Sequence, residues 1–497
     1  MEDPKSKKYI ASYDFGTSGV KSVLVGEDGQ VLAHASAGYP LLTPHNGWAE
    51  QDPEMDWRAI CRATQQAMAA VELTPDDVIG VVFGTMWKGI IPVDRQGKVL
   101  YPCMIWLDAR AEKQAAVLNE RMHTDRFCAQ DYWARLMWLR DEQPDIYENA
   151  AYILENNAYL KFRATGKLGS DLSNCFVTSV KPPLKKEYEE IMAAADLDLQ
   201  KFPPCVMPWD HVGDLSEQAA SELGLAVGTP VFGGCGDIPA IVIGSGSSDM
   251  DAAHIYLGSS GWLGVTVPER RENVGETYSS LDDKKEILLY TMQSACMTFD
   301  WAIRCFYKNE WESQGSGVYA LIEQELSQIP AGSDGMIAAP WLHGERPPLS
   351  EKARALFFNI KASHDRRYFV NAVQESVCYM LRSKLDTYRK ESGRPIEKLR
   401  VVGGAAASNH WMQMLSDILE IPVEVPADSR HVGAIGSAYC ALIGLGRCAD
   451  FEQTNQSITV ERCFYPRAAN KNVYDRNYAV FSGLYPALCK SFEAINT

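Results

Sequence analysis

The chain has 497 residues, of which 46% are hydrophobic and 23% are charged, an ordinary composition for a globular protein. This length predicts two or three domains, each with its own core. The formal net charge is −16 and no long basic block offsets it, so neither duplex nucleic acid nor an anionic membrane is an expected partner.

The lack of a recognisable targeting signal and the pattern of cysteines predict a cytoplasmic protein. Residues 1–8 are polar and lack the apolar core of a signal peptide, and no segment reaches the roughly 18 uninterrupted apolar residues of a membrane span. The 13 cysteines are scattered, with no Cys-x-x-Cys pair. We therefore expect reduced thiols in a cytoplasmic protein and no structural metal.

The first half opens with an apolar strand, a small-residue turn and a second apolar run over residues 10–25. Backbone N–H groups in a turn of Gly, Ser and Thr converge on one point and can bind phosphate oxygens. The residues that would do so are Gly16, Thr17, Ser18 and Lys21. A tight hairpin turn without a ligand explains this segment equally well.

The next elements predict α/β layering. The Asp28-Gly29 turn favours a hairpin that ends with residues 31–33. Asp52 is expected to cap a helix with Pro53 in its first position. Residues 78–83 are a continuously apolar strand, the type found in sheets covered on both faces.

Residues 231–240 carry a carboxylate, Asp237, on a glycine-rich turn after an apolar strand. Such a carboxylate could take a proton from a hydroxyl nucleophile. The alternative is that Asp237 caps a helix beginning around Pro239. Both roles can hold together.

Residues 254–265 repeat the strand–turn–strand design of the first half, with Ser259, Ser260 and Gly261 in the turn. The repetition predicts two related lobes that grip one polyphosphate. Gly, Ser and Asp cluster near residues 244–252, which places the domain boundary there and gives domains 1–248 and 249–497.

The second half continues with alternating helices and strands. The pattern predicts a helix over 369–385, strands at 399–402 and 423–425, and a helix over 432–445. Asn409 is expected to cap a further helix.

Two loops of the second half carry candidate functions. Gly403, Gly404 and Ala405 would let a flat ring lie against the backbone, although a close-packed strand-to-helix turn explains them as well. The proline-stiffened loop 341–348 places Glu345 beside Arg346, an expected ion pair that could orient the lobes or only bridge the surface.

Taken in order, these segments resemble the FGGY carbohydrate kinases of the actin-like superfamily. The resemblance covers nearly the whole chain through residues 14–21, 47–51, 106–110, 159–166, 234–237, 257–261, 344–346 and 403–404. It implies an α/β fold of two actin-like (ribonuclease H-like) domains with a catalytic cleft between them. Domain 1–248 would bind the sugar and carry the first phosphate turn, and domain 249–497 would bind the nucleotide.

The resemblance also implies ATP and Mg²⁺ as cofactors and a sugar hydroxyl as acceptor. Asp237 would be the general base, and Asp14 would act on the metal side, holding Mg²⁺ through water. The implied phosphate-binding residues are Gly16, Thr17, Ser18, Lys21, Ser259, Ser260 and Gly261. The implied nucleotide-binding residues are Gly403, Gly404, Ala405 and Asn409, and the sugar-facing ones are Met86, Trp87, Trp106, Asp108, Asp237 and Ile238.

Within the family, the opening motif and the Gly-Glu-Arg-Pro loop look most like xylulokinases, which favours D-xylulose as substrate. Trp87 stands where the xylulokinase pattern has His, and Ile238 where it has Asn. Lys88 adds a charge that could favour an acidic sugar such as gluconate, although a side chain that points to solvent explains it as well. Other ketoses, polyols and aldonates follow D-xylulose as candidates, and a homodimer, common in the family, is a candidate assembly.

Two other function classes use the same fold. A non-catalytic sugar or nucleotide sensor would keep the lobes and lose turnover. A chaperone-like or filament-forming ATPase would have no use for Asp237. Stimulation of ATP turnover by a sugar separates a kinase from both.

Overall fold

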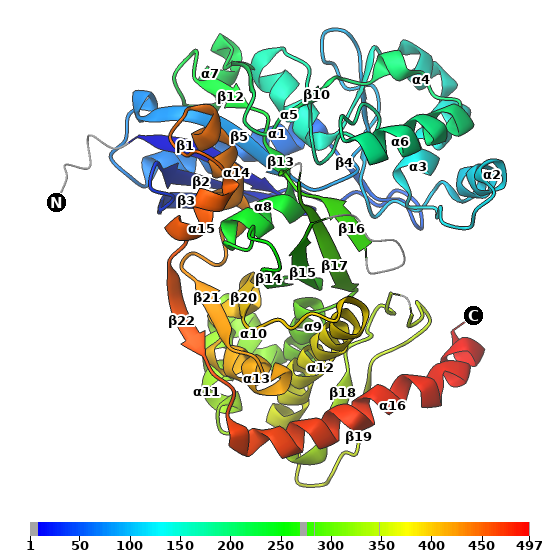
Figure 1. Ribbon diagram of the computed structural model, residues 1–497, viewed down its shortest axis with the longest axis vertical. Helices are drawn as coiled ribbons and strands as arrows, with labels where there is room; N and C mark the ends of the chain where they lie inside the picture. Colours follow the sequence, from blue (N-terminus) through cyan, green and yellow to red (C-terminus); the bar gives the residue numbers. More distant parts are fainter. Residues whose placement is uncertain (1–7, 269–275, 283, 347, 497) are drawn as a thin grey trace. The chain divides into compact units, whose positions relative to one another are not determined.

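The computed structural model describes residues 8–268, 276–282, 284–346 and 348–496 (Figure 1). The polar residues 1–7 and Pro347 of the proline-rich loop therefore lie outside the described residues. The chain forms two compact units. The first comprises Met1–Gly244, Ser279–Asp283 and His431–Ser457, and the second Ser245–Tyr278, Lys284–Arg430 and Ile458–Thr497.

Each unit is made of three separate segments of the chain, whereas the predicted domains, 1–248 and 249–497, are continuous. The reason is α14 (Val432–Gly444), which packs against β1 and β5 of the first unit although it follows most of the second unit in sequence. Its small residues allow this close approach.

The first unit is built on a seven-stranded sheet in the order β11-β12-β5-β1-β2-β3, with β13 also paired to β5. β1, β2 and β3 form an antiparallel meander, and β1 runs parallel to β5. The strands are β1 (Tyr9–Phe15), β2 (Gly19–Gly26), β3 (Val31–Gly38), β5 (Val78–Thr85), β11 (His211–Asp214), β12 (Pro230–Phe232) and β13 (Cys235–Gly236).

The second unit has a seven-stranded sheet in the order β16-β17-β15-β14-β20-β21-β22. Its strands are β14 (Ala253–Leu257), β15 (Gly261–Val267), β16 (Glu276–Ser279), β17 (Glu286–Met292), β20 (Leu399–Val402), β21 (Val423–Pro426) and β22 (Val460–Phe464).

The two sheets share one topology. In each, an antiparallel hairpin opens the unit, its first strand pairs in parallel with a later strand, and a second parallel pair ends on an antiparallel edge strand. The strand–turn–strand repeat seen in the sequence is therefore the start of a repeated sheet, and the α/β class is confirmed.

Helices cover the first sheet and form an additional lobe in the first unit. One core lies between the sheet and α1, and a separate core joins α2, α3 and α6. The helices are α1 (Pro53–Ala69), α2 (Glu112–Met122), α3 (Tyr132–Glu142), α4 (Pro144–Asn149), α5 (Asn156–Thr165), α6 (Pro182–Ala195), α7 (Glu217–Leu223), α8 (Asp237–Gly244), α14 and α15 (Phe451–Ser457). Short strand pairs join β4 (Glu50–Gln51) to β7 (Cys103–Met104), β6 (Ile91–Val93) to β8 (Tyr152–Leu154), and β9 (Ser170–Asp171) to β10 (Cys205–Val206).

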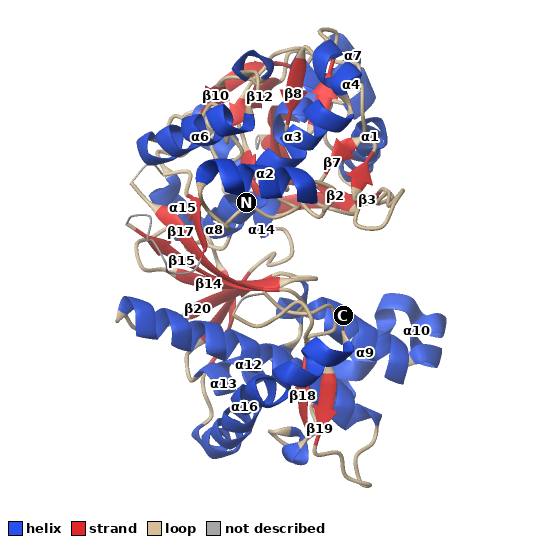
Figure 2. Cartoon of the chain, turned by 90° about the vertical axis from the view of Figure 1, so that its right-hand side faces the viewer, coloured by secondary structure: helices blue, strands red, loops and turns tan. Residues whose placement is uncertain are grey.

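In the second unit, one large core joins the sheet to its helices. The long helix α12 runs alongside this sheet (Figure 2). The helices are α9 (Cys296–Phe306), α10 (Lys308–Gln314), α11 (Val318–Leu326), α12 (Arg366–Ser392), α13 (Asn409–Leu419) and α16 (Lys471–Ile495), with a hairpin of β18 (Ile337–Ala339) and β19 (Leu356–Phe358).

One of the two predicted helix caps is present in the structure and the other is not. The Asp52 side chain accepts the N–H of Glu54 at 2.9 Å, as the Asp-Pro start of α1 predicts. The prediction that Asn409 caps α13 is wrong. Ser408 caps it by accepting the N–H of Trp411 at 3.0 Å, and Asn409 is the first helical residue.

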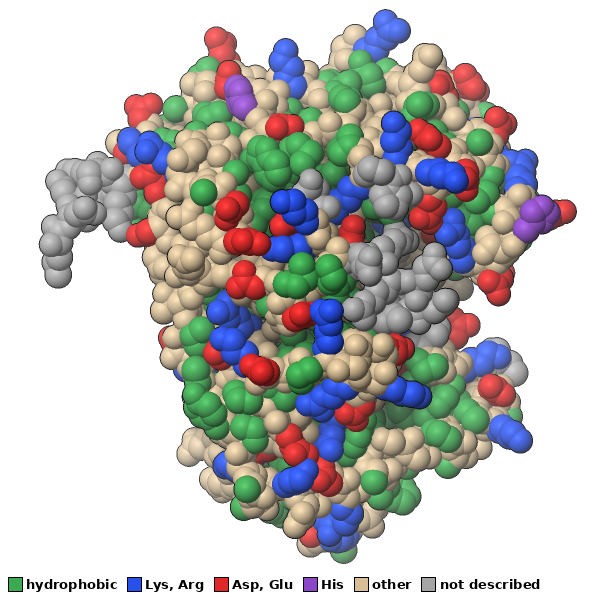
Figure 3. Space-filling model, in the orientation of Figure 1, with side chains coloured by type: hydrophobic (Ala, Val, Ile, Leu, Met, Phe, Trp, Pro, Cys, Tyr) green, Lys and Arg blue, Asp and Glu red, His purple; other side chains and the backbone are tan. Residues whose placement is uncertain are grey.

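The surface mixes charges of both signs. On the face shown in Figure 3, Lys and Arg side chains alternate with Asp and Glu rather than gathering in one basic patch. Of the helices in the described ranges, none combines the length and apolar character needed to cross a bilayer.

Two glycines let α8 and α14 meet backbone to backbone. A Cβ on Gly436 would overlap the carbonyl oxygen of Ala240, and a Cβ on Gly244 would overlap that of Val432. Because these neighbours are main-chain atoms of two packed helices, neither can move aside without shifting a whole element.

We predict that Gly436→Ala lowers the free energy of unfolding of the first unit by about 1–3 kcal/mol, the usual cost of overpacking. Gly483→Ala in α16 is the matched control, since nothing lies within 4 Å of the added Cβ, and it should stabilise by about 0.5–1 kcal/mol through helix propensity. Thermal denaturation of both variants measures the difference. Equal melting temperatures of the two variants would show that Gly436 does not need to be a glycine for α8 and α14 to pack.

Candidate functional site

The first predicted phosphate turn is a tight hairpin between β1 and β2, held by the side chains of Tyr39 and Gln51. The N–H of Gly16 donates to the carbonyl of Gly19 at 3.0 Å. The Tyr39 hydroxyl lies 2.5 Å from the Gly16 oxygen and 3.0 Å from the Gly19 oxygen. The side-chain amide of Gln51 donates to the carbonyl of Thr17 at 2.8 Å. Ser18 is exposed at the tip of the turn.

Thr17 also joins the turn to two of the predicted sugar-facing residues. The indole N–H of Trp106 donates to the Thr17 hydroxyl at 3.2 Å. The sulfur of Met86 lies 3.9 Å from the same hydroxyl. The fold thus brings Thr17, Met86 and Trp106 together although they are far apart in sequence.

Asp14 lies at the end of β1, directly opposite Lys21 on β2. The Lys21 ammonium donates to Asp14 Oδ2 at 2.8 Å, and both side chains are partly exposed. Gly433, in the first turn of α14, leaves space for this carboxylate, since a Cβ there would lie 3.2 Å from Asp14 Cγ. The positive end of the α14 dipole and the Lys21 ammonium therefore both face Asp14.

Asp237 is the first residue of α8 and follows β13 without a linker. Its Oδ1 accepts the N–H of Ile238 at 2.9 Å, so it also serves the start of the helix. Burial, and then the negative charge of Asp14, raise the pKa of Asp237 to about 7, although main-chain hydrogen bonds oppose the shift. A partly exposed carboxyl group with this pKa is suited to accept a proton at neutral pH.

Trp87 packs directly against the backbone that leads to Asp237. A Cβ on Gly236 would overlap the indole nitrogen of Trp87. The Trp87 ring also meets Phe176 edge to face, with centroids 6.0 Å apart. Trp87 and Ile238 thus flank Asp237, and both are partly exposed.

Asp108 differs from the other predicted sugar-facing residues because its carboxylate is fully buried and fully engaged. Its Oδ2 accepts the N–H of Ala49 at 2.7 Å and the Arg110 guanidinium at 2.7 Å. The guanidinium also pairs with Glu50 at 2.6 Å and lies 3.6 Å from the centre of the Trp48 ring. This geometry supports a structural ion-pair cluster and gives no support to contact with a substrate.

The second predicted phosphate turn joins β14 to β15 and repeats the hairpin of the first unit. The N–H of Gly258 donates to the carbonyl of Ser260 at 3.0 Å, and Gly261 begins β15. The N–H groups of Ala295 and Met297, at the start of α9, donate to the carbonyl of Ser259. Ser259 itself is exposed.

The Gly403-Gly404 turn lies beside this second hairpin within the same unit. Gly403 has φ +98°, and a Cβ there would overlap the carbonyl oxygen of Leu257. Gly404 has nothing within 4 Å of the position of a Cβ, which leaves its backbone open. Ala405 is buried, and Asn409 accepts a hydrogen bond from Arg462 at 2.7 Å.

The expected ion pair between Glu345 and Arg346 is wrong. Among the described residues, no ion pair joins these side chains. Instead Glu345 Oε1 accepts the main-chain N–H groups of Gln293 at 2.8 Å and of Arg346 at 2.9 Å. The Arg346 guanidinium turns to Gln293 Oε1 and Thr291 Oγ1, each at 3.2 Å. The two side chains do not pair because the Glu345 carboxylate accepts hydrogen bonds from main-chain N–H groups instead.

The carboxylates of the first unit fit a magnesium ion that arrives with a nucleotide. Mg²⁺ keeps several waters and is bound through one or two carboxylates together with phosphate oxygens. Asp14 and Asp237 are two partly exposed carboxylates whose charges interact. In the part of the chain that the structure describes, no group of three or more His, Cys, Asp or Glu side chains has the geometry of a metal cage.

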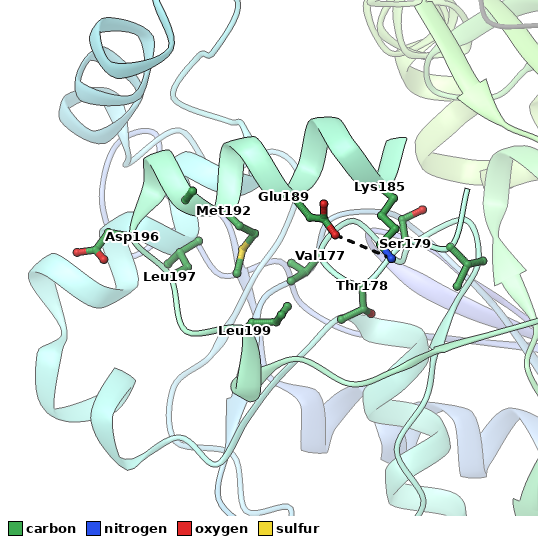
Figure 4. Close-up of a pocket in the computed structure, with 11 residues that line it drawn as sticks. Val177, Thr178, Ser179, Lys185, Glu189, Met192, Asp196, Leu197 and Leu199 are labelled. Atoms are coloured by element: carbon green, nitrogen blue, oxygen red, sulfur yellow. Dashed lines mark ion pairs between the residues drawn. The ribbon is translucent and has the colours of Figure 1, made fainter. Parts of the chain in front are cut away.

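A pocket of about 600 Å³ lies elsewhere in the first unit, between α6 and residues 177–180 (Figure 4). Apolar side chains including Met192 and Leu199 line it, and Lys185 and Glu189 form an exposed ion pair at its edge. None of the predicted site residues lines this pocket.

Two residues that shape the first-unit site were not predicted from the sequence. Gly433, which lies beside Asp14, comes from α14. Ser173 belongs to no motif seen in the sequence, yet its hydroxyl accepts the N–H of Gly236 at 2.7 Å. Neither had a local signal, because each acts through a contact made only after folding.

Comparison with known proteins identifies the family. The model of the N-terminal domain of the FGGY family of carbohydrate kinases matches residues 9–244, and that of its C-terminal domain matches residues 253–445. The xylulose kinase of Bacillus subtilis (strain 168) is 27% identical over 493 residues, covering 96% of this chain and 97% of its own. The xylulose kinase of Escherichia coli (strain K12) is 28% identical over 489 residues, covering 96% and 98%. The autoinducer-2 kinase of Enterobacter sp. (strain 638) is 27% identical over 514 residues, covering 96% and 94%.

Solved structures show the same fold. A ligand-bound xylulose kinase from Lactobacillus acidophilus superposes with a TM-score of 0.84 at 20% identity and covers 98% of this chain and 99% of its own. A gluconate kinase from the same organism also has a TM-score of 0.84 at 20% identity, covering 98% and 100%. These likenesses confirm the two-domain, actin-like α/β fold. Together with the family models, they show that this chain is a carbohydrate kinase and belongs to the FGGY family.

Proposed function

We propose that this kinase transfers the terminal phosphoryl group of ATP to a hydroxyl of a ketopentose, D-xylulose first, with Asp237 as the general base. The observation that carries the proposal is the Asp237 carboxyl group itself. It is partly exposed, it begins a helix after a glycine-rich turn, and burial and Asp14 raise its pKa to about 7. The xylulose kinases among the relatives support the choice of sugar.

In the proposed reaction the protein forms no covalent bond to the substrate. In phosphoryl transfer, positioning and charge stabilisation supply most of the rate enhancement. Asp237 accepts the proton of the attacking hydroxyl, which makes that oxygen a better nucleophile. Asp14 would hold the water shell of Mg²⁺, and Mg²⁺ would neutralise charge that develops on the phosphate oxygens. Lys21 and the N–H groups of the first turn hold phosphate oxygens.

The second unit is proposed to bind the nucleotide. The open backbone at Gly404 offers a surface for a flat ring, and Gly403 lies against the strand that leads into the second hairpin. Ser259, Ser260 and Gly261 would contact phosphates. Asn409 and Ala405 would lie at the edge of the adenosine site.

A second substrate, gluconate, is favoured by one specific observation. Lys88 is partly exposed next to Trp87 and holds a left-handed conformation with φ +62°. The buried Arg135 guanidinium donates to the Lys88 carbonyl at 2.8 Å and so fixes this turn. The Lys88 side chain thus starts from a fixed backbone beside Trp87, and an ammonium group that turned toward the sugar would attract an acidic one.

We predict that Asp237→Asn lowers kcat by roughly 10²–10⁴-fold, the usual cost of removing a positioned base, and leaves the Kd for ATP within a few-fold. Asp125→Asn, an exposed site in the same unit, is the matched control and should retain full activity. A coupled assay and calorimetric titration give the two quantities. Turnover of Asp237→Asn within a few-fold of the native protein would remove Asp237 from the role of base.

The pH dependence of kcat/KM follows from the same carboxyl group. Only deprotonated Asp237 can accept a proton, so kcat/KM should be level above pH 7 and fall as pH drops through about 7. Below that point, the decline should approach tenfold per pH unit. A profile that stays level down to pH 5 would show that the titrating carboxyl group does not limit the reaction.

A panel of ketoses, polyols and aldonates tests the substrate. We predict that D-xylulose stimulates ATP turnover most and that ATP hydrolysis without sugar is weak. If gluconate gives the higher kcat/KM and Lys88→Met abolishes this preference, the acidic-sugar alternative replaces xylulose. Turnover independent of every sugar would indicate an ATPase, and binding without turnover a sensor.

A further inference from the structure

The turn that carries Asp237 is held by side chains from segments that contribute nothing else to the site. Residues 233–236 connect β12 to α8 and include the two-residue strand β13. Three glycines make this turn narrow and conformationally free. Its backbone therefore needs external contacts to present Asp237 in one orientation.

Ser173 supplies the contact next to Asp237. Its hydroxyl oxygen accepts the N–H of Gly236 at 2.7 Å, and its hydroxyl proton goes to Asp171 Oδ1 at 2.5 Å. Ser173 and Asp171 are 4% and 0% exposed. A hydrogen bond to a charged acceptor that is buried away from solvent is shorter and stronger than one between neutral groups.

Asp171 is itself fixed, so it can orient the serine. Its Oδ1 also accepts the main-chain N–H of Ser173 at 3.0 Å, and its Oδ2 accepts the side-chain amide of Asn174 at 2.9 Å. With both oxygens engaged, the carboxylate cannot rotate without breaking several bonds at once. The Ser173 hydroxyl proton consequently points to Asp171, and its lone pair points to Gly236.

The other end of the turn is held by Lys161 of α5. Its buried ammonium donates to the carbonyl of Gly233 at 2.7 Å. The Cβ that Gly236 lacks would overlap the Trp87 ring and would lie 3.2 Å from Ser173 Oγ. The backbone before Asp237 is thus enclosed by an indole ring and two hydrogen bonds.

From these contacts we infer that Ser173 is a positioning residue for the phosphoryl-transfer reaction, fixed by Asp171 and acting through the Gly236 N–H to aim the Asp237 carboxyl group. The inference rests on the proposed function, because it assigns a purpose to the orientation of Asp237. It predicts an effect on the chemical step and not on substrate binding. A displacement of about 1 Å at a reacting group can cost roughly 10²-fold in rate.

The test measures kcat and KM for Ser173→Ala with ATP and the best sugar of the panel. We expect kcat to fall about 10- to 100-fold while both KM values stay within a few-fold. Ser173→Thr keeps the hydroxyl and should recover most of kcat. Ser179→Ala is the matched control, because Ser179 is also 4% exposed and lies on the same segment, and it should retain native kcat.

A double-mutant comparison separates positioning from a structural role. If Ser173 acts through Asp237, Ser173→Ala should cause no further loss of kcat in an Asp237→Asn background. A further 10-fold loss there would overturn the inference, as would native kcat in the single variant. Should Ser173→Ala not fold, Ser173→Cys replaces it, since a thiol is a weak acceptor of similar shape and should give the same loss of kcat.

The two failures are distinguishable. If Asp237→Asn keeps its turnover, the base assignment fails and the positioning role fails with it. If Asp237→Asn loses turnover but Ser173→Ala does not, only the positioning role is wrong.

Discussion

The first-unit site depends on the backbone contact between α8 and α14. Gly436 and Gly244 allow these helices to meet at their main-chain atoms, where any side chain would overlap a carbonyl oxygen. The first residue of α8 is Asp237, and Gly433 in the first turn of α14 lies against Asp14. The helix contact therefore brings the two carboxylates into the same part of the first unit, because Asp237 begins α8 and Asp14, at the end of β1, lies against α14.

The charge of Asp14 contributes to the raised pKa of Asp237. Two carboxylates close enough to interact cannot both be ionised without cost, so the less solvated one holds its proton to a higher pH. Asp14 faces the Lys21 ammonium at 2.8 Å and the start of α14, whereas main-chain N–H groups are the hydrogen-bond donors to Asp237 within the described residues. The two carboxylates therefore have different surroundings, and only Asp237 has the raised pKa that the proposed role of base requires.

Local sequence signals predicted the elements and much of the site, and long-range contacts supplied the rest. The strand–turn–strand repeat, the Asp52 cap and the placement of Asp237 after a buried strand all depend on neighbouring residues, and the structure confirms them. The Asn409 cap and the Glu345–Arg346 pair were wrong because Ser408 and the main-chain N–H groups competed for the same positions. The return of α14 to the first unit and the Ser173 contact could not be predicted, since each joins residues far apart in sequence. The ligand roles of the two hairpins and of the Gly403-Gly404 turn stay predictions.

The role of Asp237 as a base depends on its proton affinity, which infrared difference spectroscopy measures. A protonated carboxyl group has a carbonyl stretch that a carboxylate lacks, and Asp237→Asn identifies the band that belongs to this residue. We expect a band that is present at pH 5.5, absent at pH 8.5, titrates near pH 7 and is missing from the variant. A spectrum in which the substitution removes no such band at pH 5.5 would contradict it, because Asp237 would then be an ordinary ionised carboxylate.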